Sequence, residues 1–210
     1  MKQVNGERFT RLIAYLPAQR PLALLDIGCG ECLEGRALVE AGVRLTGIDQ
    51  DEVAIREARR CLPEATFASG DAADPPVAWW GRFDAVLIRR PDLFAQPGRW
   101  QQVFAALPAY LTKSGTVIVT TVSAAEADLA ERWLRESKIL ITTAEEAPIM
   151  DEARILVGYG VREMPPAGPK PAQAAPRISI IKWDADDDAL GPICDMETGL
   201  CTDPDEEEIS

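Results

Sequence analysis

Three aspartates, Asp26, Asp49 and Asp71, each stand at the end of a short apolar run. The first lies in Asp26-Ile27-Gly28-Cys29-Gly30, where two glycines permit a tight turn and a close approach of the backbone to a ligand. A helix that begins after such a turn offers unpaired N–H groups. Because carboxylates accept hydrogen bonds from hydroxyl and amino groups, these residues predict a site for a nucleotide-like ligand.

The elements that must position these aspartates follow from the periodicity. From Leu22 onward, short apolar runs alternate with amphipathic stretches, a pattern typical of βα units that build a parallel sheet. Strands are predicted at 22–27, 43–48, 65–69, 83–88, 116–122, 139–143 and 154–161, and helices at 31–41, 52–62, 100–111 and 126–137.

The last two predicted strands follow one another without room for a helix, so we expect them to form an antiparallel pair at the sheet edge. The predicted fold class is therefore α/β, with three layers and a doubly wound, mostly parallel seven-stranded sheet. Open α/β sheets bind ligands at the carboxyl ends of their strands, where all three aspartates fall.

A dinucleotide site is one interpretation of the glycine turn, and it requires G-x-G-x-x-G. The position of the third glycine is Leu33 here, which weakens an NAD(P)-dependent oxidoreductase as an alternative.

The segment from Leu22 to Arg162 resembles the class I S-adenosylmethionine-dependent methyltransferases. Their first motif is an acidic residue, one further residue and G-x-G-x-G at the end of the first strand, which Asp26 to Gly30 match up to Cys32 at the third glycine. The resemblance implies that Asp49 accepts hydrogen bonds from the ribose hydroxyls and Asp71 from the adenine amino group. The cofactor-binding residues that it predicts are Asp26, Gly28, Cys29, Gly30, Asp49, Gln50, Asp71 and Ala72.

The fourth strand is followed by Arg89 and Arg90, where the family places substrate and catalytic groups. Either arginine is a candidate for holding an anionic substrate or the methionine carboxylate. The chain has no histidine, so the general base of many small-molecule O-methyltransferases is absent and no catalytic residue is assigned. Methyl transfer from a sulfonium is an in-line displacement that orientation and desolvation can promote. The Trp79-Trp80 pair favours core packing over a substrate wall.

The predicted function is methyl transfer to an unidentified small or medium-sized acceptor. A second hypothesis is a non-catalytic, methyltransferase-like protein that binds the cofactor and acts as a partner-binding or regulatory module. The substituted third glycine and the missing base favour that alternative slightly.

Charge separates the chain into parts. Residues 165–210 hold three basic and eleven acidic residues, and thus −8 of the net −12. We predict a Rossmann-like domain at 1–164, a Pro/Ala linker at 165–176 and an acidic, largely disordered tail at 177–210, which could include a short strand at 177–183 and could contact a basic partner. The sequence has no cluster of Lys and Arg, which argues against nucleic acid as a partner. No apolar run suits a membrane span or a secretory leader. We therefore expect the protein in the cytoplasm.

The five cysteines are too few and too unevenly placed for a disulfide framework. Cys29 and Cys32 form a C-x-x-C that the glycine motif explains without redox chemistry. For Cys194 and Cys201, a reversible disulfide, a metal site and no function remain open. We predict no bound metal, since the acidic run at 184–188 fits a solvated tail better than a calcium loop.

Overall fold

The computed structural model describes residues 12–19, 21–146, 152–160, 193–194 and 201–202. Backbone contacts separate the chain into two compact units, Met1–Met164 and Pro165–Ser210. Among the described residues, no helix combines the length and the apolar character that crossing a membrane requires.

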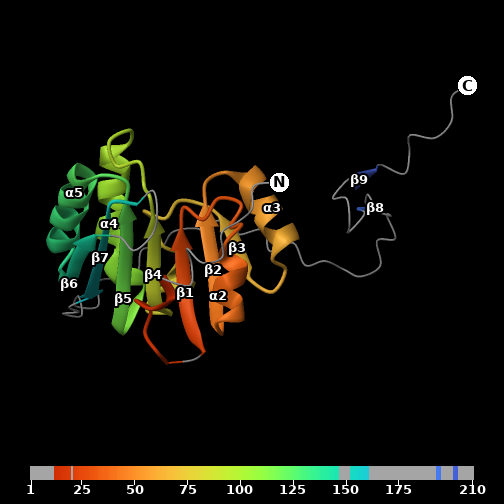
Figure 1. The fold of residues 1–210 in the computed structure, drawn as a ribbon, viewed down its shortest axis with the longest axis horizontal. Helices are drawn as coiled ribbons and strands as arrows, with labels where there is room; N and C mark the ends of the chain where they lie inside the picture. The colour runs from red at the N-terminus through yellow and green to blue at the C-terminus, as the bar shows by residue number, and fades with distance from the viewer. Residues whose placement is uncertain (1–11, 20, 147–151, 161–192, 195–200, 203–210) are drawn as a thin grey trace, which may run out of the picture. The chain divides into compact units, whose positions relative to one another are not determined.

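The first unit is built on a seven-stranded sheet with the order β3-β2-β1-β4-β5-β7-β6 (Figure 1). Strands β3, β2, β1, β4 and β5 are parallel, whereas β7 is antiparallel to both β5 and β6. The predicted α/β fold with an antiparallel edge pair is therefore confirmed. The strands are β1 (Leu22–Ile27), β2 (Val43–Asp49), β3 (Thr66–Ser69), β4 (Phe83–Arg89), β5 (Leu111–Thr121), β6 (Ile139–Glu146) and β7 (Arg154–Gly160).

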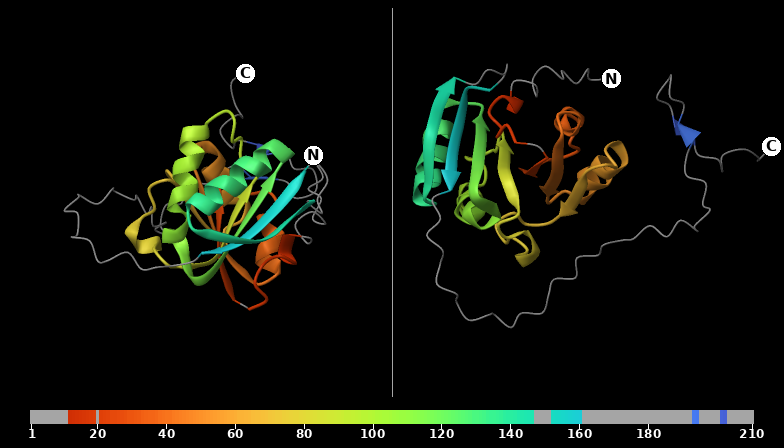
Figure 2. Two further views of the ribbon diagram at one scale, coloured as in Figure 1. Left: turned by 90° about the vertical axis from the view of Figure 1, so that its left-hand side faces the viewer. Right: turned by 90° about the horizontal axis from the view of Figure 1, so that it is seen from below.

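Helices cover both faces of this sheet (Figure 2). One face packs against α4 (Pro97–Tyr110) and α5 (Ala124–Glu136), and the other against α2 (Gly35–Glu40), α3 (Glu52–Cys61) and the segment around Leu12 and Leu16. Strand β1 is apolar except at Asp26 because both of its faces are covered, and Leu24 and Leu25 are fully buried.

Local sequence sets the ends of these helices. The side chain of Asp51 accepts hydrogen bonds from the Val53 and Ala54 amides at 2.8 and 3.2 Å, and thereby caps α3. At the start of α5, the Ser123 hydroxyl oxygen accepts a hydrogen bond from the Glu126 amide, and the Glu126 carboxylate accepts one from the Val122 amide. The connection between β3 and β4 contains a single 3-10 turn, η1 (Val77–Trp79), in place of an α-helix. Helix α4 reaches the edge of the sheet above β1, where a Cβ on Gly28 would lie 3.7 Å from the Trp100 ring.

The predicted boundaries were wrong by three or more residues at four ends of elements, one of which is the end of β6 at Glu146 rather than at residue 143. The first helix begins at Gly35 rather than at residue 31, because Cys32 has a left-handed φ of 50° that an α-helix cannot include. Helix α4 begins earlier, with Pro97 in its first turn. Strand β5 begins at Leu111 because this residue pairs with Phe83 ahead of a register shift.

In the second unit, β8 (Ile193–Cys194) pairs in antiparallel fashion with β9 (Cys201–Thr202), with Cys194 opposite Cys201 in the backbone register. The predicted linker at 165–176, the short strand at 177–183 and the acidic run at 184–188 lie outside the described residues.

Candidate functional site

The site is built at the edge where the parallel strands β1, β2 and β3 end. Gly28 and Gly30 adopt positive φ values of 73° and 54°, so the two glycines of the motif are needed for the turn itself. The amides of Gly28 and Cys29 donate hydrogen bonds to the Ile48 carbonyl at 2.8 and 3.3 Å. The turn is thereby fixed to the end of β2.

Asp49 joins the same two elements through its side chain. Its Oδ2 accepts a hydrogen bond from the Gly30 amide at 2.8 Å, and its Oδ1 accepts one from the Asp51 amide at 3.0 Å. An ionised carboxylate can accept about four hydrogen bonds, so both oxygens retain a lone pair for a ligand. The carboxylate is therefore held in one orientation while it can still accept from hydroxyl groups.

Asp26 lies beneath the glycine turn and is only 6% exposed. Burial raises the pKa of Asp26 from an ordinary 3.8 to about 7, the nearby Arg89 guanidinium opposes this shift, and the carboxylates of Asp49 and Glu34 add to it. A buried carboxyl with this pKa ionises more readily when a cation binds beside it.

Asp71 and Ala72 form the third part of this edge. The Oδ1 of Asp71 accepts a hydrogen bond from the Ala73 amide at 2.9 Å and forms an ion pair with the Arg99 Nη2 at 2.8 Å. The Tyr110 hydroxyl donates to the Ala72 carbonyl at 3.0 Å, which fixes this turn to α4. Desolvation raises the pKa of Tyr110, so the hydroxyl remains a donor.

A cavity of about 190 Å³ opens between these turns and α4. It is smaller than the roughly 300–1,000 Å³ of pockets that enclose a drug-sized ligand, so it suits one part of such a ligand. Its lining includes predicted residues and others that the sequence did not indicate: Ile27, Gly28, Ile48, Asp49, Gln50, Gly70, Ala72, Gln96, Arg99, Trp100 and Val103.

The two thiols near the turn are partly buried and pack against neighbouring residues. A Cβ on Gly47 would lie 2.7 Å from the Cys29 Sγ, and one on Gly35 would lie 2.6 Å from the Cys32 Sγ. Desolvation raises the pKa of both cysteines, which disfavours the reactive thiolate.

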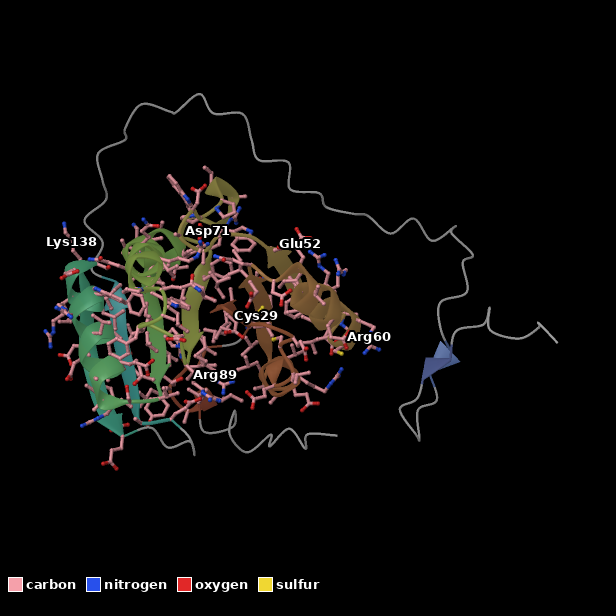
Figure 3. The ribbon with its side chains drawn as sticks, turned by 90° about the horizontal axis from the view of Figure 1, so that it is seen from above. Cys29, Glu52, Arg60, Asp71, Arg89 and Lys138 are labelled. Atoms are coloured by element: carbon pink, nitrogen blue, oxygen red, sulfur yellow. The ribbon has the colours of Figure 1, made fainter. Side chains whose placement is uncertain are left out.

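The arginines after β4 have different surroundings. Arg89 forms ion pairs with Glu34 and with Glu152, the latter at 3.1 Å, and the Glu152 side chain is only 2% exposed. Arg90 is exposed, has a left-handed φ of 48°, and its amide donates to the Thr120 carbonyl at 2.9 Å. Figure 3 looks onto this edge and shows Cys29 between Asp71 and Arg89.

The structure thus brings the predicted cofactor residues and the two arginines to one edge of the sheet. The partners Glu34, Arg99 and Glu152 could not be predicted from the sequence, because they come from segments distant from the residues that they contact. Trp79 packs against Phe83 with ring centroids 5.7 Å apart, as the core-packing interpretation predicts, whereas Trp80 is half exposed and its indole N–H donates to the Pro75 carbonyl.

Comparison with known proteins gives two kinds of similarity. Residues 24–115 match the sequence model of the methyltransferase-domain family. A curated relative, trans-aconitate 2-methyltransferase of Delftia acidovorans (strain DSM 14801 / SPH-1), is 32% identical over an alignment that covers 41% of this chain and 40% of that protein. The match therefore spans well under half of the relative's length.

Solved structures extend the fold similarity over most of the first unit. A TehB-like SAM-dependent methyltransferase from Corynebacterium glutamicum matches with a TM-score of 0.60 and 19% identity, over 75% of this chain and 88% of that one. Geranyl diphosphate C-methyltransferase from Streptomyces coelicolor A3(2), solved with S-adenosyl-L-homocysteine, matches with a TM-score of 0.60 and 12% identity, over 75% and 79%. The [4+2]-cyclase SpnF matches with a TM-score of 0.62 and 17% identity, over 73% and 81%, so the fold also occurs in a protein named for a different reaction.

Proposed function

We propose that this chain is a class I S-adenosylmethionine-dependent methyltransferase and that it transfers the methyl group of this cofactor to a small or medium-sized acceptor; the family match of residues 24–115 supports the proposal. The observation that carries the proposal is the Asp49 carboxylate, which the Gly30 and Asp51 amides hold at the rim of the cavity.

The nucleoside half of the cofactor fits the residues on the α4 side. Asp49 would accept hydrogen bonds from the two ribose hydroxyls, since both of its oxygens keep acceptor capacity. The adenine would lie in the cavity beside Gln50 and Ala72, with its amino group near Asp71. The indole of Trp100 adds an apolar wall, since a Cβ on Gly28 would lie 3.7 Å from its ring.

The methionine half fits the glycine turn. The backbone of Gly28, Cys29 and Gly30 has no bulky side chain facing the cavity, so a ligand can lie directly against it. Asp26, buried below the turn, would ionise beside the ammonium group of the methionine, because a neighbouring cation favours the charged carboxylate.

The acceptor would lie beyond the end of β4. We assign the exposed Arg90 to an anionic group of the acceptor and Arg89 to positioning, because Arg89 is already paired with two glutamates. The bound cofactor supplies an activated methyl group on its sulfonium. The chain contributes orientation and exclusion of water, which need no histidine base.

A cytoplasmic location is part of the proposal. Cys29, Cys32 and Cys61 are free thiols, which fits a reducing compartment.

Isothermal titration with S-adenosylmethionine and S-adenosylhomocysteine, with NADH as a control ligand, tests the cofactor. We expect saturable binding of the first two and about 10- to 100-fold weaker binding to Asp49→Ala, because a charged hydrogen bond is lost. The matched control is Asp128→Ala, an exposed aspartate on α5. Binding of NADH alone would instead support an oxidoreductase.

Transfer itself is tested with a methyl-labelled donor and a panel of small carboxylates and phosphates that includes trans-aconitate. Label in one acceptor, lost in Arg90→Met while cofactor binding persists, supports the proposal. Cofactor binding without transfer to any acceptor class would favour the regulatory module.

A further inference from the structure

Arg99 connects three elements at the rim of the cavity. It lies in the first turn of α4, and its Nη2 forms an ion pair with Asp71, which follows β3. With the Gln50 amide oriented so that its oxygen faces α4, the same guanidinium also donates to Gln50, which follows β2. Both Gln50 and Arg99 line the cavity.

The hydrogen bond and the ion pair of Asp71 that the structure records are made by one of its two carboxylate oxygens. Oδ1 accepts a hydrogen bond from the Ala73 amide at 2.9 Å, and the Arg99 Nη2 lies 2.8 Å from the same oxygen in an ion pair. No hydrogen bond from the described part of the chain reaches Oδ2. The hydrogen bond and the ion pair at this oxygen restrict the orientation of the carboxylate and leave the other oxygen to accept from a ligand.

The ion pair contributes little to the stability of the fold. The side chain of Arg99 is 36% exposed and that of Asp71 is 44% exposed, and ion pairs at such positions are weak because water screens them. A planar guanidinium that donates to Gln50 and pairs with Asp71 is, however, well suited to fixing the relative orientation of these two side chains.

We propose that Arg99 is a positioning residue for recognition of the purine. By holding Oδ1 of Asp71, it presents Oδ2 to the exocyclic amino group of adenine. A purine with a carbonyl oxygen at that position would bind more weakly, because it has no hydrogen to donate to Oδ2. The inference rests on the proposed function, since it assigns a residue to the selectivity of the same cofactor site.

The test compares the affinity for S-adenosylhomocysteine with that for its deaminated analogue, S-inosylhomocysteine. The first variant, Arg99→Met, keeps most of the side-chain length and removes the charge. The second, Arg99→Lys, keeps the charge and removes the planar guanidinium. The matched control is Arg36→Met, because Arg36 forms a comparably exposed ion pair with Glu64 on the surface of α2.

We expect Arg99→Met to bind S-adenosylhomocysteine about tenfold more weakly and to lose most of its preference over the inosyl analogue, with Arg99→Lys in between. The Arg36→Met control should match the wild type in both. In an Asp71→Asn background, Arg99→Met should have little further effect, because the arginine acts through that carboxylate.

An unchanged preference in Arg99→Met, or tighter binding, would overturn the inference. So would an equal loss of affinity in both Asp71 backgrounds. If the wild type binds neither nucleoside, it is the proposed function that fails. Thermal unfolding of each variant shows whether it folds. If Arg99→Met is misfolded, the nucleoside preference of Arg99→Lys is compared with that of the wild type instead.

Discussion

The Gly30 amide donates a hydrogen bond to the Oδ2 of Asp49 at 2.8 Å, across 19 residues of sequence. The glycine turn after β1 and the carboxylate after β2 are therefore a single structural unit. A change at either residue will alter the other.

Substitution of Asp49 should loosen the glycine turn as well as weaken ligand binding. We expect Asp49→Ala to lower the free energy of unfolding by about 1–2 kcal/mol, because the Gly30 and Asp51 amides lose their acceptor. Hydrogen exchange of the Gly30 amide should accelerate. Asp49→Asn keeps an acceptor oxygen and should show a smaller change, and equal exchange rates in both variants would contradict this account.

Asp26 predicts a pH dependence of stability. The pKa of Asp26 is about 7 in the folded chain and near 3.8 when unfolded. Between these pH values the folded state binds more protons than the unfolded state. The contribution of Asp26 to the free energy of unfolding therefore falls as pH rises from 3.8 to 7. Asp26→Asn should therefore be more stable than the wild type by about 1–3 kcal/mol at pH 8. The difference should shrink towards pH 5, as chemical denaturation at the two pH values would measure. A constant difference would be inconsistent with the pKa.

Removal of the Arg89 charge should destabilise the fold. Arg89→Met leaves Glu152 buried without its cation, and breaking such a pair costs about 2–4 kcal/mol, measured by urea denaturation. Combining it with Glu152→Gln should restore part of the loss. The exposed neighbour Arg90 provides the control, since Arg90→Met should stay within about 0.5 kcal/mol of the wild type.

Two glycines should respond in opposite directions to alanine. A Cβ on Gly47 would lie 2.6 Å from the Phe67 ring and 2.7 Å from the Cys29 Sγ, so Gly47→Ala should cost about 1–3 kcal/mol of unfolding free energy. A Cβ on Gly98, within α4, would meet no atom within 4 Å, so Gly98→Ala should stabilise by about 0.5–1 kcal/mol. Thermal unfolding of the two variants provides the comparison.

Much of the framework could be predicted from local sequence. The alternation of apolar runs and amphipathic stretches predicted seven strands and the antiparallel pair, because burial on both faces imposes continuous apolar strands. The positions of Asp49 and Asp71 at strand ends followed from the same alternation.

What could not be predicted depends on tertiary contact. The left-handed φ of Cys32 delays α2, and no local pattern marks that residue as left-handed. Arg99 reaches Asp71 only because α4 packs over the edge of the sheet, and Glu152 reaches Arg89 from 63 residues away. Such partners are set by packing between elements rather than by spacing along the chain.

The placement of β7 between β5 and β6 has a consequence for folding during synthesis. The strand of this sheet that comes last in the sequence fills an interior position, so residues 154–160 must leave the ribosome before β5 acquires the neighbour that it has in the folded domain. Until then β5, whose residues Val117 to Val119 become fully buried, presents an open strand edge, and such edges template aggregation. A nascent chain that stalls before Arg154 would therefore leave this edge of β5 without the strand that covers it in the folded domain.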